Sequence, residues 1–165
     1  MIQAESDFPG RLVYALFYLD TAPYPMRDSY YAFDPCPGPV VDGIKVSYTK
    51  ITTGTIFPPA INRQSGVDLT ASLAGGTLSG SVQNTSGGEL TALHVRVFKV
   101  NNDDPLYKPN LVVAIVAEDA LVTPLADGDS DTFNVTGITL AGTEKLVVFI
   151  QSDTNKEVFH AVYAQ

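Results

Sequence analysis

The sequence predicts a mainly β protein, in which a C-terminal β-sandwich of about seven strands follows a small α/β part. From Val67 onward, short apolar runs alternate with clusters of glycine, asparagine, aspartate and serine. Short strands separated by such turn signals are typical of a β-sandwich. Residues 1–66 instead carry most of the prolines and tyrosines. We therefore expect two parts, residues 1–66 and residues 67–165.

Seven strands are expected in the second part, at residues 67–73, 77–84, 90–100, 111–118, 131–137, 145–152 and 157–164. In the third, Leu93, Val95 and Val97 alternate with His94 and Arg96, as in a half-buried strand. Residues 146–150 are apolar at every position, which predicts a central strand buried on both faces.

The first part reads as mixed α and β structure. Residues 11–19 (RLVYALFYL) are almost continuously apolar and end at turn signals, which favours a strand buried on both faces. Residues 26–33 and 58–64 suit short helices that begin near prolines. Asp42 and Gly43 stand between the mainly apolar runs 40–41 and 44–46, and Asp-Gly in that position is a strong hairpin signal.

Composition narrows the range of functions. The chain has 165 residues and a formal net charge of −8, and its ten Lys and Arg residues are scattered. An acidic chain without a basic patch is not expected to bind nucleic acid. No apolar stretch approaches the roughly 20 residues of a spanning helix. The first ten residues lack the basic start of a signal peptide.

The single cysteine, Cys36, excludes an internal disulfide and a Cys-x-x-Cys pair within this chain. It lies in a proline-rich loop that could expose a reactive thiol. No Lys, Arg or His lies within eight residues of it to lower the thiol pKa, so an unreactive residue is the favoured interpretation. Tyr24, Tyr30 and Tyr31 could stack against a glycan or a peptide. The favoured alternative is that these tyrosines build the core of the first part and its contact with the sandwich.

A weak calcium motif lies between two predicted strands. Asp127, Asp129 and Asp131 have the alternate spacing of a calcium-binding loop. Thr132 occupies the position of the usual glycine, and Ile138 that of the usual glutamate. A solvated turn is the favoured interpretation, and we expect no obligatory cofactor.

No catalytic constellation is evident. The two histidines, His94 and His160, fall on different predicted strands, and no Gly-x-Ser-x-Gly motif is present. A zinc site would need three or four nitrogen or sulfur ligands, and two histidines with one cysteine are a bare minimum. We expect both histidines to be ordinary surface or edge residues. Asn84 and Asn134 begin glycosylation sequons, which are common by chance.

Several motifs resemble a known arrangement. These are Tyr30-Tyr31 before the proline loop, Gly38-Pro39, Val41-Asp42-Gly43, His94-Val95 and the run at 147–151. The chain resembles a family of bacterial outer-membrane and secreted proteins in which a thioredoxin-like domain precedes an immunoglobulin-like sandwich. Pro39 matches the cis-proline of the thioredoxin-like fold, and an X-Pro bond is the inexpensive place for a cis peptide. The front strands and the Cys-x-x-Cys pair of that fold are missing here.

These observations favour a non-enzymatic structural or binding module of the cell envelope or the extracellular space. One alternative is a degenerate thioredoxin-like protein that assists thiol chemistry, and another is a carbohydrate-binding module that uses the N-terminal tyrosines. Residues 11–19 offer an apolar strand with few partners, and such strands invite pairing between chains. We therefore expect a homodimer through the first part.

Overall fold

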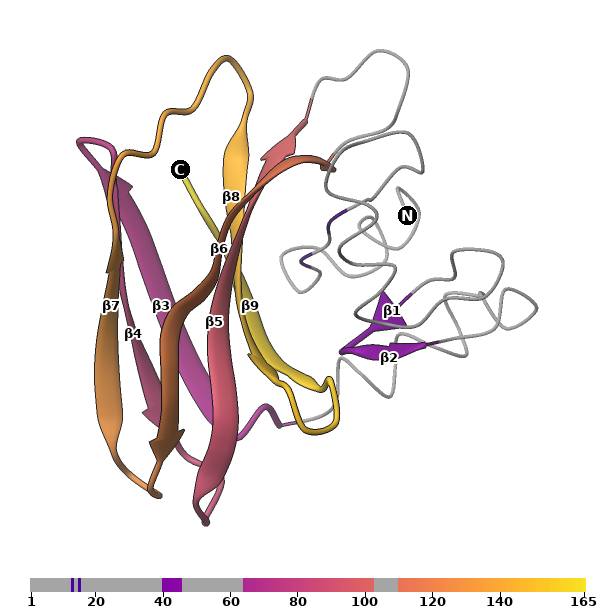
Figure 1. Cartoon of the computed structure of the whole chain (residues 1–165), viewed down its shortest axis with the longest axis vertical. Coiled ribbons are helices and arrows are strands. Elements are labelled where there is room, and N and C mark those ends of the chain that lie inside the picture. Colours follow the sequence, from indigo (N-terminus) through magenta and orange to yellow (C-terminus); the bar gives the residue numbers. More distant parts are fainter. Residues whose placement is uncertain (1–12, 14, 16–39, 46–63, 103–109) are drawn as a thin grey trace.

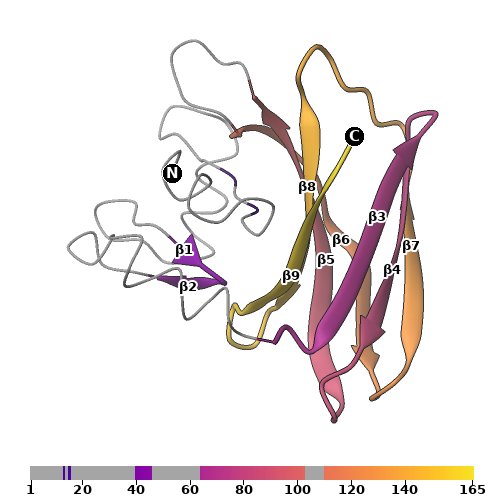
Figure 2. The ribbon, with the colours of Figure 1, turned by 180° about the vertical axis from the view of Figure 1, so that it is seen from behind.

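The computed structural model of the chain describes residues 13, 15, 40–45, 64–102 and 110–165, and seven strands of this portion form two facing antiparallel sheets (Figures 1 and 2). The small sheet contains β3 (Val67–Ala74), β4 (Thr77–Asn84) and β7 (Ser130–Val135) in the order β3-β4-β7. The large sheet has the order β6-β5-β8-β9 and contains β5 (Leu90–Asn101), β6 (Leu111–Leu125), β8 (Lys145–Ser152) and β9 (Val158–Ala164).

The predicted β-sandwich is confirmed, and most predicted strand boundaries agree with the structure within one or two residues. β8 is central, flanked by β5 and β9, and all but its first residue are buried, as expected from an apolar run. No described residue is helical, so the α/β part predicted for residues 1–66 is not seen in that portion, and no helix there could span a membrane. The helix predicted at 26–33 lies outside the described residues, as does the one at 58–64 except for Gln64, which is not helical.

β6 is the clearest error of strand prediction. We expected it to end at residue 118, but it continues to Leu125. Between the pairs Val95↔Leu121 and Val97↔Ala117, β6 advances four residues while β5 advances two. A bulge of this kind turns extra residues away from the regular ladder. Glu118 and Asp119, where the strand was expected to end, occupy this bulge.

The main core fills the space between the two sheets. It is formed by the inward-facing residues of both, including Leu78 and Val82 of the small sheet and Val95, Val148 and Ile150 of the large sheet, none of which is exposed. Burial of side chains of this size contributes about 1.5–3 kcal/mol each. In β5, Leu93, Val95 and Val97 lie in the main core, as the predicted alternation implies. The expected half-burial is wrong, because Arg96 on the other face is buried as well.

A second apolar cluster lies on the opposite, outward face of the large sheet. We call it the outer patch; it consists of Phe98, Val100, Val112, Val147 and Phe149, all buried. The rings of Phe98 and Phe149 meet edge to face with centroids 4.8 Å apart. Val13 and Ala15, from the N-terminal part of the chain, pack against this patch.

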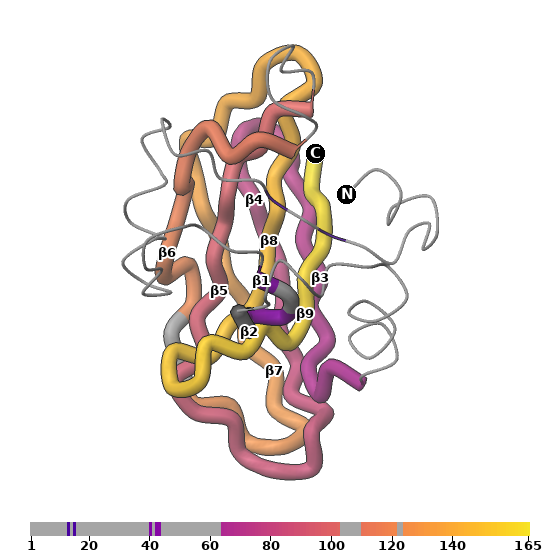
Figure 3. The backbone as a smooth tube through the Cα atoms, turned by 90° about the vertical axis from the view of Figure 1, so that its right-hand side faces the viewer, coloured from indigo at the N-terminus to yellow at the C-terminus, as the bar shows by residue number. Residues whose placement is uncertain are grey.

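The hairpin predicted around Asp42 and Gly43 is present. β1 (Val40–Val41) and β2 (Ile44–Lys45) pair antiparallel, and both turn residues have positive φ, 50° and 82°. Positive φ at both positions is the geometry of the tight hairpin turn that Asp-Gly favours. The hairpin lies in front of the outward face of the large sheet, near the β8–β9 connection (Figure 3).

Candidate functional site

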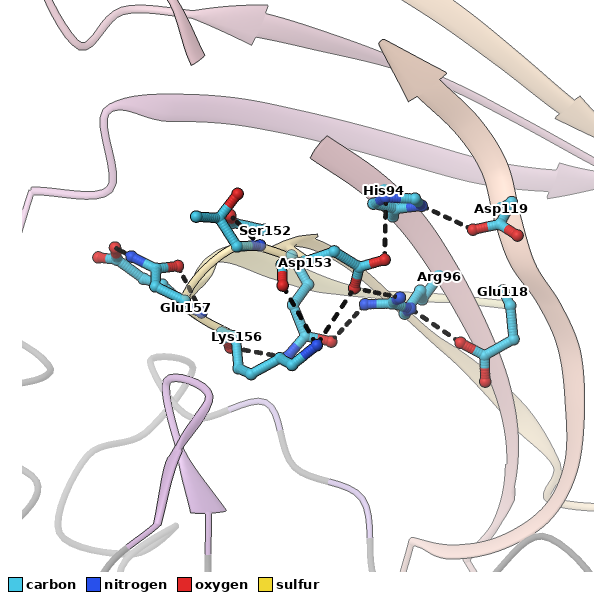
Figure 4. Close-up of polar contacts among 11 residues, drawn as sticks. His94, Arg96, Glu118, Asp119, Ser152, Asp153, Lys156 and Glu157 are labelled. Atoms are coloured by element: carbon cyan, nitrogen blue, oxygen red, sulfur yellow. Dashed lines mark hydrogen bonds and ion pairs between the residues drawn. The ribbon is translucent and has the colours of Figure 1, made fainter. Parts of the chain in front are cut away.

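Charged and amide side chains gather on the outward face of the large sheet, near the outer patch (Figure 4). We call this group the polar cluster; its members are His94, Arg96, Glu118, Asp119, Gln151, Asp153 and Lys156. They come from β5, the β6 bulge, β8 and the turn after β8. Along β5, His94 and Arg96 take the same outward face as Phe98 and Val100, so one strand carries both the polar and the apolar half of this face.

Arg96 is the centre of the cluster, with only 4% of its side chain exposed. Its guanidinium donates from Nε to Glu118 Oε2 at 2.8 Å. It also donates from Nη1 to Gln151 Oε1 at 2.7 Å and from Nη2 to Asp153 Oδ1 at 2.8 Å. A buried charge is tolerated when it is paired and hydrogen-bonded, and the rigid fork of arginine suits several oxygen acceptors.

His94 lies between two carboxylates. Its Nδ1 is 2.6 Å from Asp119 Oδ1 and its Nε2 is 3.0 Å from Asp153 Oδ2. Each ring nitrogen of His94 therefore has a carboxylate oxygen within hydrogen-bond distance. Asp153 bridges two side chains of β5, with Oδ2 on His94 and Oδ1 on Arg96.

The cluster continues into the turn between β8 and β9. Gln151 donates from Nε2 to the Lys156 carbonyl at 2.7 Å, and the Lys156 ammonium donates to the Asp153 carbonyl at 3.2 Å. Lys156 has a positive φ of 67°. These contacts hold the β8–β9 turn in place. The same turn contacts the β1–β2 hairpin, so the turn links the polar cluster to the hairpin.

The turn contact itself is close. Val158 donates its N–H to the Asp42 carbonyl at 2.9 Å. A Cβ atom placed on Gly43 would lie 1.6 Å from the Lys156 carbonyl oxygen, so only glycine fits there. We call this pairing of Asp42–Gly43 with Lys156–Val158 the turn contact.

The charged groups of the polar cluster are paired with partners inside the cluster. The hydrogen-bond donors of its cations point at carboxylate, amide or carbonyl oxygens of neighbouring segments. Within the described portion of the chain, no three His, Cys, Asp or Glu side chains come together in a way that could hold a metal ion. What the geometry does is cross-link β5, β6 and β8 to the β8–β9 turn.

Sequence reasoning missed this cluster. The expectation that His94 is an ordinary surface or edge residue is wrong, because β5 is a central strand and the His94 side chain is only 14% exposed. His160 does lie on an edge strand, and its Nδ1 is 2.9 Å from the Val67 carbonyl oxygen and 3.2 Å from the Leu69 nitrogen. It therefore connects β9 to β3 across one side of the sandwich.

The two sequon asparagines differ sharply. Asn84 is fully buried and donates from Nδ2 to the carbonyls of Gly88 and Leu125, each at 2.7 Å. Its amide nitrogen is therefore buried and hydrogen-bonded within the fold, and a glycan could not be attached to it. Asn134 is exposed on β7 and accepts a hydrogen bond from Ser79 at 2.7 Å.

Most predicted site residues fall outside the described residues: Tyr24, Tyr30, Tyr31, Cys36 and Pro39. The three calcium candidates are described, and the structure does not assemble them into a ligand group. The Asp127 carboxylate accepts the Gly87 N–H at 2.9 Å, and that of Asp131 accepts the Thr132 N–H at 2.7 Å. Asp129 is exposed, and its carbonyl accepts the Asn84 N–H at 3.0 Å. The segment is thus arranged as a turn tied to the end of β4.

No protein-family model matches the chain, and no curated protein matches it. Among solved structures, the chain is similar to a domain of the outer membrane lipoprotein Omp28 from Porphyromonas gingivalis, with 13% identity and a TM-score of 0.36 over 61% of this chain and 90% of that chain. It is also similar to a Niemann-Pick type C2 protein from Japanese carpenter ant, with 17% identity and a TM-score of 0.35 over 59% of this chain and 87% of that chain.

Proposed function

We propose that this protein is a non-enzymatic structural or binding module of the cell envelope or the extracellular space. The observation that carries the proposal is the polar cluster. Its charged groups are directed at one another and cross-link strands, as with Arg96, which has three side-chain partners. A general acid, a general base or a nucleophile must instead reach a substrate atom.

The strand order supports the finer proposal that the sandwich is immunoglobulin-like. The first, second and fifth strands of the sandwich form one sheet, and the third, fourth, sixth and seventh form the other. In immunoglobulin-type folds the first, second and fifth strands likewise share a sheet, and the third, sixth and seventh share the other. The envelope location and a partial thioredoxin-like module over residues 1–66 are proposed from the sequence resemblance described above.

The proposal is tested by locating the natural gene product in its source cells with an epitope tag, followed by fractionation. We expect it in the envelope fraction or in the medium, and recovery in the cytosol would contradict the proposal. Turnover of a disulfide substrate is measured in parallel, with Cys36→Ser as the matched variant. Turnover that depends on Cys36 would favour the thioredoxin-like alternative instead. Glycan binding that disappears in Tyr30→Ala would favour the carbohydrate-binding alternative.

We further propose a homodimer through the N-terminal part. The apolar sequence of residues 11–19 supports it, because apolar segments invite pairing between chains. Of the strand expected there, only Val13 and Ala15 are described, and neither lies in a strand. Light scattering at micromolar concentration measures the mass directly. A monomer would contradict this assembly.

A further inference from the structure

The outward face of the large sheet is buried where a two-layer sandwich would leave it in water. Val100 and Val112 are completely buried, and Val147 and Phe149 are 4% and 7% exposed. An antiparallel sheet with one solvated face usually carries polar side chains there. The outer patch is apolar instead. Four residues of the large sheet itself pack against it, and residues from outside the sheet add to its cover; the four are Ile115, Val158, Ala161 and Tyr163.

Described residues of the N-terminal part supply contacts for that cover. Val13 and Ala15 both pack against the outer patch. Both side chains therefore contact the same apolar cluster of the large sheet. The side chains that meet are apolar on both sides, as in a packed core.

A second contact joins the same two parts of the chain at a different place. In the turn contact, Val158 donates to the Asp42 carbonyl, and Gly43 lies directly against the Lys156 carbonyl. The Lys156 carbonyl also accepts from Gln151 of the polar cluster, which holds it in position. The contacts of Val13 and Ala15 and those of Asp42 and Gly43 are far apart in sequence, but all are made with the large sheet or its β8–β9 turn.

We infer that the outward face of the large sheet is an intramolecular interface that binds the N-terminal part of the same chain. Val13 and Ala15 bind at the outer patch, and Asp42 and Gly43 bind at the β8–β9 turn. This inference is independent of where the protein is located and of any ligand.

The experiment measures thiol labelling of the full chain, with Cys36→Ser in every variant. Val147→Cys reports on the outer patch, and its neighbour Val148→Cys, which faces the main core, reports on the sandwich itself. Val113→Cys, at a position 37% exposed, gives the rate of an open site. We expect Val147→Cys to label at least about tenfold more slowly than Val113→Cys, because labelling of a covered site tracks its opening free energy.

Adding Ala15→Asp places a carboxylate in the contact, which should open the cover and raise the Val147→Cys rate at least about tenfold, while Val148→Cys stays protected. If Ala15→Asp unfolds the whole protein, Val148→Cys will also label faster. The milder variant Val13→Ala is then used instead of Ala15→Asp, and we again expect faster labelling of Val147→Cys with Val148→Cys protected.

Three results would overturn the inference. One is a Val147→Cys rate equal to that of Val113→Cys in the otherwise unaltered chain. Another is a Val147→Cys rate that the substitution at the contact leaves unchanged. The third is a Val147→Cys rate that falls as protein concentration rises, because a second copy would then be the cover.

Discussion

Replacing Gly43 by alanine tests whether the turn contact stabilises the fold. A Cβ atom at this position would lie 1.6 Å from the Lys156 oxygen, 2.5 Å from its carbonyl carbon and 2.9 Å from the Glu157 Cα. All three are backbone atoms, so no side-chain rotation can relieve the overlap. The turn must move or the contact must open, and overpacking of this kind costs about 1–3 kcal/mol.

The matched control is Gly137→Ala. Gly137 has a φ of 78°, close to the 82° of Gly43, but a Cβ atom there meets nothing within 4 Å. Both variants pay the left-handed backbone cost of about 1–2 kcal/mol and share the same effect on the unfolded chain. The difference between them therefore isolates the overlap with the β8–β9 turn.

We expect Gly43→Ala to lower the free energy of unfolding by about 1–3 kcal/mol more than Gly137→Ala, measured by urea denaturation. In thermal melts this corresponds to about 2–4 °C per kcal/mol for a chain of this size. Hydrogen exchange supplies a local readout, since the Val158 amide donates to Asp42 and should exchange faster only in Gly43→Ala. Equal losses of stability in the two variants, with unchanged exchange at Val158, would refute the reasoning.

Two further substitutions test the polar cluster and the small sheet. Arg96→Met leaves three hydrogen-bonded partners without their donor, and should cost about 2–4 kcal/mol in urea denaturation. The control Lys99→Met removes the half-buried ion pair between Lys99 and Glu144, 3.4 Å apart, and should cost no more than about 1 kcal/mol. If Arg96→Met and Lys99→Met lowered stability by similar amounts, the polar cluster would not act as a cross-link between strands. Gly80→Ala places a Cβ atom against both the Phe133 ring and the Thr70 carbonyl oxygen, and should cost about 1–3 kcal/mol by the same assay. Gly88→Ala, with open space around it, should be nearly neutral, and a neutral Gly80→Ala would show that both the Phe133 ring and the β3 backbone can shift.

The sequence predicted most of the sandwich because its signals are local. Alternation of apolar and polar residues marks a strand, and glycine, asparagine and aspartate mark the turns between strands. β4 and β8 begin and end where the pattern predicted. The Asp42-Gly43 turn was predicted for the same reason, since the positive φ it needs is a property of two adjacent residues.

The polar cluster was not predicted because the presence of a charged residue in the sequence does not show which side chain of another strand lies opposite it. In sequence, Glu118 and Asp119 look like the end of a strand, since adjacent carboxylates are usually solvated. In the structure they lie in a bulge opposite β5, where Arg96 and His94 are their partners. That pairing depends on the register between two strands, which no local pattern contains.

By itself, then, the sequence determined which segments are strands, where the tight hairpin turn lies and that β8 is central. Only the tertiary structure decided how the strands divide between two sheets, that His94 lies between two carboxylates and that Val13 and Ala15 pack against the outer patch of the large sheet. The physical reason is that alternation defines two faces of a strand, whereas burial of each face depends on a partner distant in sequence.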